Sequence, residues 1–185
     1  MFHIKSDKRS QTSAKLVCDA MLQLLEIKTF DEITISDIQR KSTIGRATFY
    51  RLFDNTIDVL HYLCDQIFEN ITLQQKDLNQ PPSQTMILFI QQWMNNDILL
   101  KGIMESGHIE VLYRVIFPRM EDAKQLLHFD VCTDDDSTDY LINIATTALI
   151  GGLSAWMKHG KRETADEVFQ SIKNVINVLH HTINY

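Results

Sequence analysis

The sequence predicts an all-α protein of about nine helices. Apolar residues recur every three or four positions over most of the 185 residues, which is the spacing of a helix face. No stretch shows the alternation that a half-buried strand requires. Six glycines and three prolines are few for this length and favour long helices over many turns. With 44% apolar residues, the chain is long enough for one large or two small domains.

The N-terminal helices are the most clearly delimited. Periodic apolar residues predict a first helix over about residues 11–28, and residues 29–32 end it. Thr34 is expected to cap a second helix, and Asp37 three residues later completes a capping-box-like pair. This second helix is expected to end near residues 41–42.

The remaining helices follow in order along the chain. Gly45 is the expected cap of the third helix, and residues 81–83 form the clearest linker-like break. Residues 131–137 are expected to form an acidic loop, and an interior Pro118 to bend its helix. The helices expected after the second are 46–52, one from 56 to about 75–79, 83–95, a short one ending near 105, 108–128, 140–157 and 164–183.

Charge is unevenly distributed along the chain. The net charge is −6, which is unusual for a protein that binds nucleic acid. Residues 1–60 hold nine Lys or Arg and eight Asp or Glu, whereas residues 61–185 hold nine and sixteen. This asymmetry fits a small head that faces nucleic acid and an acidic body. Lys5, Lys8 and Arg9 are expected to precede the first helix and to supply local positive charge.

Cysteine usage indicates a reducing compartment. The three cysteines are far apart, their number is odd, and no CxxC pair occurs, which argues against a disulfide framework or a zinc site. The first ten residues lack the apolar run of a signal peptide. A cytoplasmic protein without cofactor or metal is therefore expected. The apolar stripe around Cys64 indicates that this thiol lies in the core.

Signals of enzymatic chemistry are weak. The acidic run at 134–136 with Asp139 lacks the glycine and terminal glutamate of an EF-hand loop. His180 and His181 are adjacent, so they point to different helix faces and cannot chelate a metal like an i, i+4 pair. No Gly-rich phosphate loop or GxSxG motif occurs. No enzymatic activity is expected.

Residues 33–60, ITISDIQRKSTIGRATFYRLFDNTIDVL, contain the most informative pattern. A short helix, a tight break and a second short helix rich in groups that can reach bases and phosphates make a helix-turn-helix. This stretch resembles the TetR family of bacterial transcriptional regulators, strongly from about Lys15 to Leu60 and only in architecture beyond. The end of the penultimate helix, 156–160, is similar to that of many members from low-GC Gram-positive bacteria. The residues that carry the resemblance are Thr34, Ile38, Thr48-Phe49-Tyr50, Phe53 and Val59-Leu60.

The resemblance implies a domain organisation and a function. Residues 1–55 would form a three-helix DNA-binding domain, and residues 56–185 a helical dimerisation and effector-binding domain. The protein would be a homodimeric regulator, most often a repressor in this family, that binds a palindromic operator in double-stranded DNA and leaves it when a small-molecule effector binds. The alternative, from a different class, is a co-regulator or protein-binding adaptor that kept the fold and lost or weakened operator binding.

The expected DNA contacts centre on the third helix. Arg46 lies in its first turn and can donate two parallel hydrogen bonds to guanine. Thr48 suits a thymine methyl or a phosphate, Arg51 suits the backbone, and the resemblance implies a phosphate contact for the Tyr50 hydroxyl. For each residue the alternative is ordinary helix surface, or for Tyr50 the core. The candidate DNA-binding residues are Lys8, Arg9, Thr34, Ser36, Arg46, Ala47, Thr48, Tyr50, Arg51 and Thr56.

Three positions depart from the family pattern. Thr43 replaces the turn glycine, so a left-handed backbone angle there would be costly. Gly45 replaces the usual Ser or Thr cap at little cost. Thr56 replaces a lysine at the start of the fourth helix, where the helix N–H groups still attract phosphate. These changes are expected to affect operator affinity more than the fold.

The last two helices are expected to pair with their copies in a four-helix bundle. Residues 140–157 carry no charge, which makes a membrane span possible by length, but polar residues and two glycines favour a buried helix and no membrane partner. The alternative is that both helices are core within one chain. The candidate interface residues are Ala148, Gly151, Gly152, Ala155, Phe169, Ile172, Ile176 and Leu179.

An effector pocket is the other working part that the resemblance implies. Large apolar side chains of the body could line it, and methionine adapts to irregular shapes. At helical spacing the same residues are ordinary core in the alternative interpretation. The candidate pocket residues are Phe68, Phe89, Trp93, Met104, Leu112, Tyr113, Ile116 and Trp156.

Overall fold

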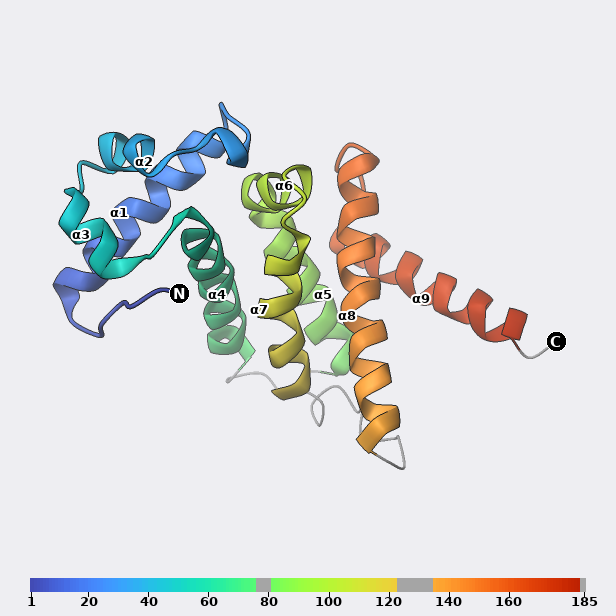
Figure 1. Cartoon of the computed structure of the whole chain (residues 1–185). Helices are drawn as coiled ribbons and strands as arrows, with labels where there is room; N and C mark the ends of the chain where they lie inside the picture. Colours follow the sequence, from blue (N-terminus) through green and yellow to red (C-terminus); the bar gives the residue numbers. More distant parts are fainter. Residues whose placement is uncertain (76–80, 123–134, 184–185) are drawn as a thin grey trace. The chain divides into compact units, whose positions relative to one another are not determined.

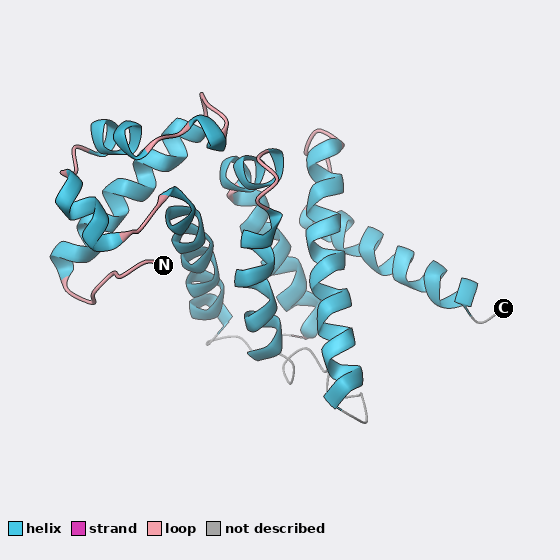
Figure 2. Cartoon of the chain, viewed as in Figure 1, coloured by secondary structure: helices cyan, strands magenta, loops and turns pink. Residues whose placement is uncertain are grey.

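The computed structural model describes residues 1–75, 81–122 and 135–183, which are almost entirely helical (Figures 1 and 2). No strand occurs in these ranges, and one isolated bridge joins Phe2 to Phe53. The predicted all-α fold class is therefore confirmed. The elements are α1 (Lys8–Leu25), the 3₁₀ turn η1 (Phe30–Glu32), α2 (Ile35–Ser42), α3 (Arg46–Leu52), α4 (Thr56–Gln75), α5 (Pro82–Asn95), α6 (Asp97–Glu105), α7 (Ile109–Asp122), α8 (Asp135–Lys158) and α9 (Ala165–Ile183).

The first helix begins and ends earlier than expected. Asp7 caps α1, because its side chain accepts a hydrogen bond from the backbone N–H of Ser10 at 2.9 Å. Lys8 and Arg9 therefore lie in the first turn of α1, and the expectation that they precede the helix was wrong. The helix ends at Leu25, three residues before the expected end at residue 28.

Other boundaries follow the local signals closely. Pro82 is the first residue of α5, where its missing N–H would have no partner in any helix. Residues 135–137, expected in a loop, belong to α8, because acidic residues favour the first turn of a helix. The rest of that expected loop and residues 123–128 of the expected long helix lie outside the described residues. Pro118 lies inside α7, and a bend there stays a prediction.

Packing divides the described chain into two compact units. The N-terminal unit comprises Met1–Gln66 and Asp97–Leu112, and the C-terminal unit comprises Ile67–Asn96 and Tyr113–Tyr185. The divisions fall inside α4 and α7, so each of these helices contributes residues to both units. The expected functional boundary after residue 55 stays a prediction.

The N-terminal unit has a core between α1, α2 and α3. Ile38, Phe49 and Phe53 are fully buried and form part of this core. Helix α6 also packs on α1 in this unit. A Cβ at Gly102 would lie only 2.7 Å from Cδ2 of Leu25, so glycine permits this close approach.

The start of α2 is fixed by the predicted capping box. The Thr34 hydroxyl accepts a hydrogen bond from the Asp37 backbone N–H at 3.1 Å, and the Asp37 carboxylate accepts from the Thr34 N–H at 3.1 Å. The carboxylate also accepts from the Thr34 hydroxyl at 2.8 Å and pairs with Lys28 at 3.2 Å. The Thr34 hydroxyl and N–H, followed by Lys28, lower the pKa of Asp37 to about 2.

The Asp37 carboxylate makes the stability of the unit depend on pH. Its pKa falls from 3.8 to about 2 on folding, so its contribution is complete above pH 3.8 and is lost as pH falls through 2. We expect Asp37→Asn to lower the free energy of unfolding at pH 7 and to flatten its decline between these values. Urea unfolding across this pH range measures both effects. Asp19→Asn, at an exposed carboxylate of α1, is the control and should retain the decline.

The C-terminal unit is built on α5, α8 and α9, which pack on one another. Phe68, Phe89 and Trp93 form an aromatic cluster in it, with ring centroids 5.2 to 6.4 Å apart. Helix α8 is long and apolar enough to span a membrane by composition, a test that core helices also pass. Beyond its first turns, α9 runs away from α8 toward the C-terminus (Figure 1).

Candidate nucleic-acid interface and dimerisation groove

The turn between α2 and α3 is strained at the position where the sequence departs from the family pattern. Thr43 has φ 60° and ψ 14°, which is the left-handed conformation that β-branched residues avoid. The left-handed backbone angle that was expected to be costly at Thr43 is thus present in the structure. Gly45 has the extended backbone of a cap at φ −66° and ψ 153°, and a Cβ there would meet no atom within 4 Å.

Replacing Thr43 with glycine should stabilise the protein. A left-handed angle costs an L-residue roughly 1–2 kcal/mol, and the flexibility of glycine in the unfolded chain returns roughly 0.5–1 kcal/mol of that. We therefore expect Thr43→Gly to raise the free energy of unfolding by roughly 0.5–1 kcal/mol. Thr43→Ala keeps a Cβ and should gain much less. A glycine variant no more stable than the alanine variant in urea unfolding would contradict this account.

Helix α3 separates its buried and exposed residues clearly. Phe49 and Leu52 are buried at 0% and 2% exposure and hold the helix on the core. Arg46, Tyr50 and Arg51 are exposed, and Tyr50 retains 42% of its surface. Because these three side chains and Ala47 recur at helical spacing, they share one solvent-facing surface.

Arg46 and Tyr50 interact with each other on this surface. The guanidinium carbon of Arg46 lies 5.4 Å from the centroid of the Tyr50 ring, within the range of a cation–π interaction. The Tyr50 ring in turn lies edge-on to Phe49, with centroids 5.7 Å apart. The buried phenylalanine thus supports the tyrosine, and the tyrosine supports the arginine.

The other candidate DNA-binding residues lie at the starts of α1, α2 and α4 or on α3, all within the N-terminal unit. Lys8 and Arg9 are exposed in the first turn of α1. Ser36 is exposed in the first turn of α2, whereas the Thr34 hydroxyl is already engaged with Asp37. Thr48 is half-buried on α3, and its hydroxyl accepts a hydrogen bond from Nη2 of Arg51 at 3.3 Å.

Two carboxylates lie at the start of α4, where the resemblance implies a phosphate contact. Thr56 is half-buried there, beside Asp54 and Asp58. The Asp58 carboxylate accepts from the Asp54 backbone N–H at 3.0 Å, and its own N–H donates to Asn55 Oδ1 at 2.9 Å. The Met1 amino group and then His3, by hydrogen bonding, lower the pKa of Asp54. Asn55 thus accepts the hydrogen bond from the helix terminus. Asp54 and Asp58 share the Met1 amino group as a cation partner, and the negative charge that remains disfavours a phosphate where the usual lysine is also absent.

The candidate effector residues do not form a single group. The aromatic cluster of Phe68, Phe89 and Trp93 lies in the C-terminal unit, as does the buried Ile116. The Tyr113 hydroxyl, also there, donates to Thr147 Oγ1 at 3.0 Å. Within the described residues, the fully buried Trp93 Nε1 and Thr146 Oγ1 have no hydrogen-bond partner. The candidates that lie elsewhere are Met104 and Leu112, in the N-terminal unit, and Trp156, in the groove described next.

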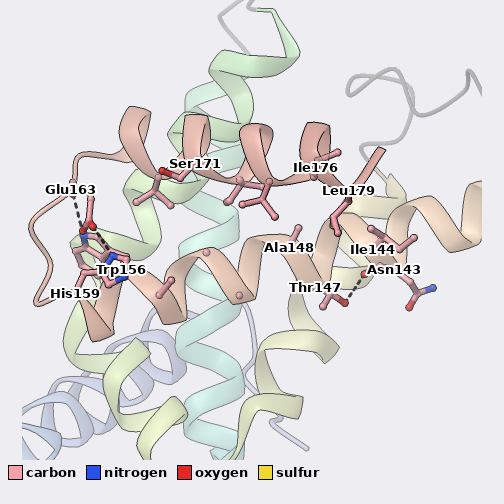
Figure 3. A pocket seen from close by; sticks show the side chains of 16 residues that line it. Asn143, Ile144, Thr147, Ala148, Trp156, His159, Glu163, Ser171, Ile176 and Leu179 are labelled. Atoms are coloured by element: carbon pink, nitrogen blue, oxygen red, sulfur yellow. Dashed lines mark hydrogen bonds and ion pairs between the residues drawn. The ribbon is translucent and has the colours of Figure 1, made fainter. Parts of the chain in front are cut away.

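Helices α8 and α9 form an apolar groove of about 660 Å³. In Figure 3, Ile144 and Ala148 of α8 and Ile176 and Leu179 of α9 lie along it, and Trp156 lies near its end at the turn between the helices. The Trp156 indole N–H donates to the Glu163 carbonyl at 3.0 Å and so fixes this turn. The candidate interface residues that line the groove are Ala148, Gly151, Gly152, Ala155, Ile172, Ile176 and Leu179.

The small residues of α8 divide between two roles. A Cβ at Gly152 would lie 2.5 Å from Cδ1 of Ile172, so this glycine lets α9 of the same chain approach. Gly151 has no neighbour that a Cβ would meet within 4 Å. Phe169, the remaining candidate interface residue, is half-buried on α9. The intrachain alternative therefore explains Gly152 and leaves much of the groove uncovered.

Large apolar side chains are exposed along the two helices that form the groove. On α8, Ile144 retains 62% of its surface, and on α9 Leu179 retains 54%. A monomeric soluble protein rarely exposes so many large apolar residues together. The exposed large apolar residues of α8 and α9 are Tyr140, Ile144, Val175, Ile176, Val178 and Leu179, and four of them, Ile144, Val175, Ile176 and Leu179, line the groove.

Two cysteines of the described chain belong to the core. Cys18 and Cys64 are buried, which confirms the structural role expected for Cys64. Burial raises the pKa of Cys18 to about 12 and also raises the pKa of Cys64, so both stay protonated and unreactive. Across residues 1–75, 81–122 and 135–183, no group of three or more His, Cys, Asp or Glu could hold a metal ion.

Comparison with solved structures decides the fold family. Lin0861 from Listeria innocua superposes with a TM-score of 0.80 at 18% identity, covering 96% of this chain and 98% of that chain. A TetR transcriptional regulator from Streptococcus agalactiae gives 0.58 at 18% identity, covering 90% and 94%. The TetR family repressor AlkX from a Dietzia species, implicated in biodegradation of n-alkanes, gives 0.54 at 17% identity, covering 88% and 92%. The chain has the TetR-family fold.

Sequence comparison adds one curated relative of this TetR-fold protein. It is the HTH-type dhaKLM operon transcriptional activator DhaS of Lactococcus lactis, 24% identical over 110 residues. The match covers 60% of this chain and spans about half, 51%, of that protein. No model of a known protein family matches the chain. The resemblance to TetR-family regulators first found in residues 33–60 is therefore confirmed at the level of the fold.

Proposed function

We propose that this TetR-fold protein is a DNA-binding transcriptional regulator that works in the cytoplasm as a homodimer. The observation that carries the proposal is the exposed face of α3, where Arg46 lies over the Tyr50 ring and Arg51 follows. A short helix with a buried apolar side and an exposed side of long hydrogen-bond donors suits the major groove. Arg46 would select bases, and the Tyr50 hydroxyl and Arg51 would bind phosphates.

The second copy of the chain would cover the apolar groove of α8 and α9. The exposed Ile144, Ile176 and Leu179 give this face the apolar character of a dimer core. Two copies would then present two heads about 34–36 Å apart, one turn of B-DNA. Such a dimer binds a palindromic operator, and one head alone binds weakly.

Release from DNA would follow from an effector in the C-terminal unit. The aromatic cluster of Phe68, Phe89 and Trp93 offers apolar surface, and the buried Trp93 N–H is a donor without an acceptor among the described residues. An apolar or aromatic molecule with one acceptor atom would satisfy it. An effector that binds better when the heads are splayed shifts the dimer away from DNA. Helix α4, which has residues in both units, would carry this coupling.

We propose repression as the output, following the resemblance to the family. Deleting the protein should then raise transcription from its own promoter. A fall would mean activation, which is the role that the name of DhaS gives to that protein.

DNA binding itself is tested by fluorescence titration with duplex from the protein's own promoter region. We expect sequence-selective binding that weakens as salt rises, because phosphate contacts release counterions. The competing function is a co-regulator or protein-binding adaptor, which the net charge of −6 and the acidic start of α4 favour. Absence of binding at low salt, with a dimer present, would support the adaptor and reject the regulator.

A further inference from the structure

The segment before α1 folds back against the end of α3. Phe2 forms the isolated bridge with Phe53, and the backbone N–H of His3 donates to the carbonyl of Leu52 at 2.8 Å. The bridge and this hydrogen bond place Lys5, two residues further on, near both α1 and α3. The backbone N–H of Lys5 also donates to the Ser10 hydroxyl at 3.1 Å, so contacts with both α3 and α1 fix the position of this segment.

This segment, the start of α1 and α3 enclose a polar hollow of about 240 Å³. Lys5, Arg9 and Arg51 all line it, and among the described residues none of the three has a carboxylate partner. Asp7, which caps α1 by accepting from the Ser10 backbone N–H, also lines it, so three cationic side chains face one carboxylate. The hollow thus concentrates positive charge on a protein whose net charge is −6.

We propose that the hollow binds one phosphate group of the DNA backbone, beside the groove that α3 enters. The inference rests on the proposed function and adds Lys5 and Ser13 to the phosphate contacts. Lysine and arginine donate charge-assisted hydrogen bonds to phosphate oxygens, and the hydroxyl of Ser13 adds a neutral donor. A backbone phosphate is favoured over a free oxyanion because Arg51 lies on α3, whose exposed face would reach the bases.

The proposal gives Lys5 a measurable share of the electrostatic binding. We expect Lys5→Gln to reduce the slope of log affinity against log salt by up to about 0.9, the value for the whole phosphate contact that Lys5 shares with Arg9 and Arg51. The loss should be equal on the promoter sequence and on an unrelated duplex, because a phosphate carries no base identity. Lys173→Gln makes the same change of charge at an exposed residue of α9 and should leave the slope unchanged.

Three outcomes separate this inference from the proposed function. A wild-type protein that binds DNA with an unchanged slope in Lys5→Gln overturns the phosphate site and leaves the regulator standing. A wild-type protein that binds no DNA overturns both. Titration with inorganic phosphate, followed by the amide NMR signals of Lys5 and Ser10, distinguishes the ligand source. Saturable shifts that Lys5→Gln abolishes, with DNA affinity unaffected, would assign the hollow to a free oxyanion and reject the DNA assignment.

Discussion

Replacing Ile176 with lysine should convert the proposed dimer into a monomer. In one chain Ile176 is 47% exposed, so an ammonium group there remains hydrated and the subunit folds normally. In the dimer the same group would be buried in the apolar groove without a partner. Leaving a charge buried and unpaired costs roughly 3–5 kcal/mol, so the dimer dissociation constant should rise by at least roughly 10²-fold.

Sedimentation velocity at micromolar concentration measures this effect, and circular dichroism checks that the fold is kept. Asn174→Lys adds the same charge two residues earlier, on a different side of α9, and should remain dimeric. The monomer should also bind operator DNA far more weakly, because it can engage only one half-site. An Ile176→Lys variant that stays dimeric would show that the partner does not cover this groove.

Replacing Arg46 with alanine should weaken binding to the cognate operator and relax the choice of base. A bidentate contact between arginine and guanine contributes roughly 1–3 kcal/mol of discrimination, which sets the size of the expected loss. Arg46 lies 5.4 Å from the Tyr50 ring centroid, so its guanidinium is already oriented before DNA binds. This orientation reduces the entropy that ordering the side chain would otherwise cost.

Tyr50→Phe separates the two roles on the same face. It keeps the ring that supports Arg46 and removes only the hydroxyl expected to contact phosphate. Binding should therefore weaken alike on all sequences, with the order of preference among operators retained. Titrations against the operator and single-base variants measure both effects, and Arg114→Ala, an exposed arginine of the C-terminal unit, is the charge-matched control. If both variants bound like wild type, α3 would not be the recognition helix.

Local signals explain why much of the fold could be predicted. The bounds of α3 matched the expected residues 46–52, and α2 ended at Ser42 as expected, because capping residues and apolar spacing act within a few residues. The left-handed angle at Thr43 could also be anticipated, because Thr43 stands where the family pattern has a turn glycine. The starts of α1 and α8 were both expected too late in the chain. At each start, more than one acidic or polar residue could begin the helix, and the earlier one does.

The sequence by itself determined the all-α class, the helix-turn-helix and the buried side of α3, because each depends on neighbours in the chain. Only the tertiary structure decided which side chain packs closely against each glycine, such as Leu25 against Gly102 and Ile172 against Gly152. It also placed Lys5 beside Arg51, forty-six positions later, in one hollow. Such groupings depend on contacts between distant segments, and periodicity within a helix carries no information about them.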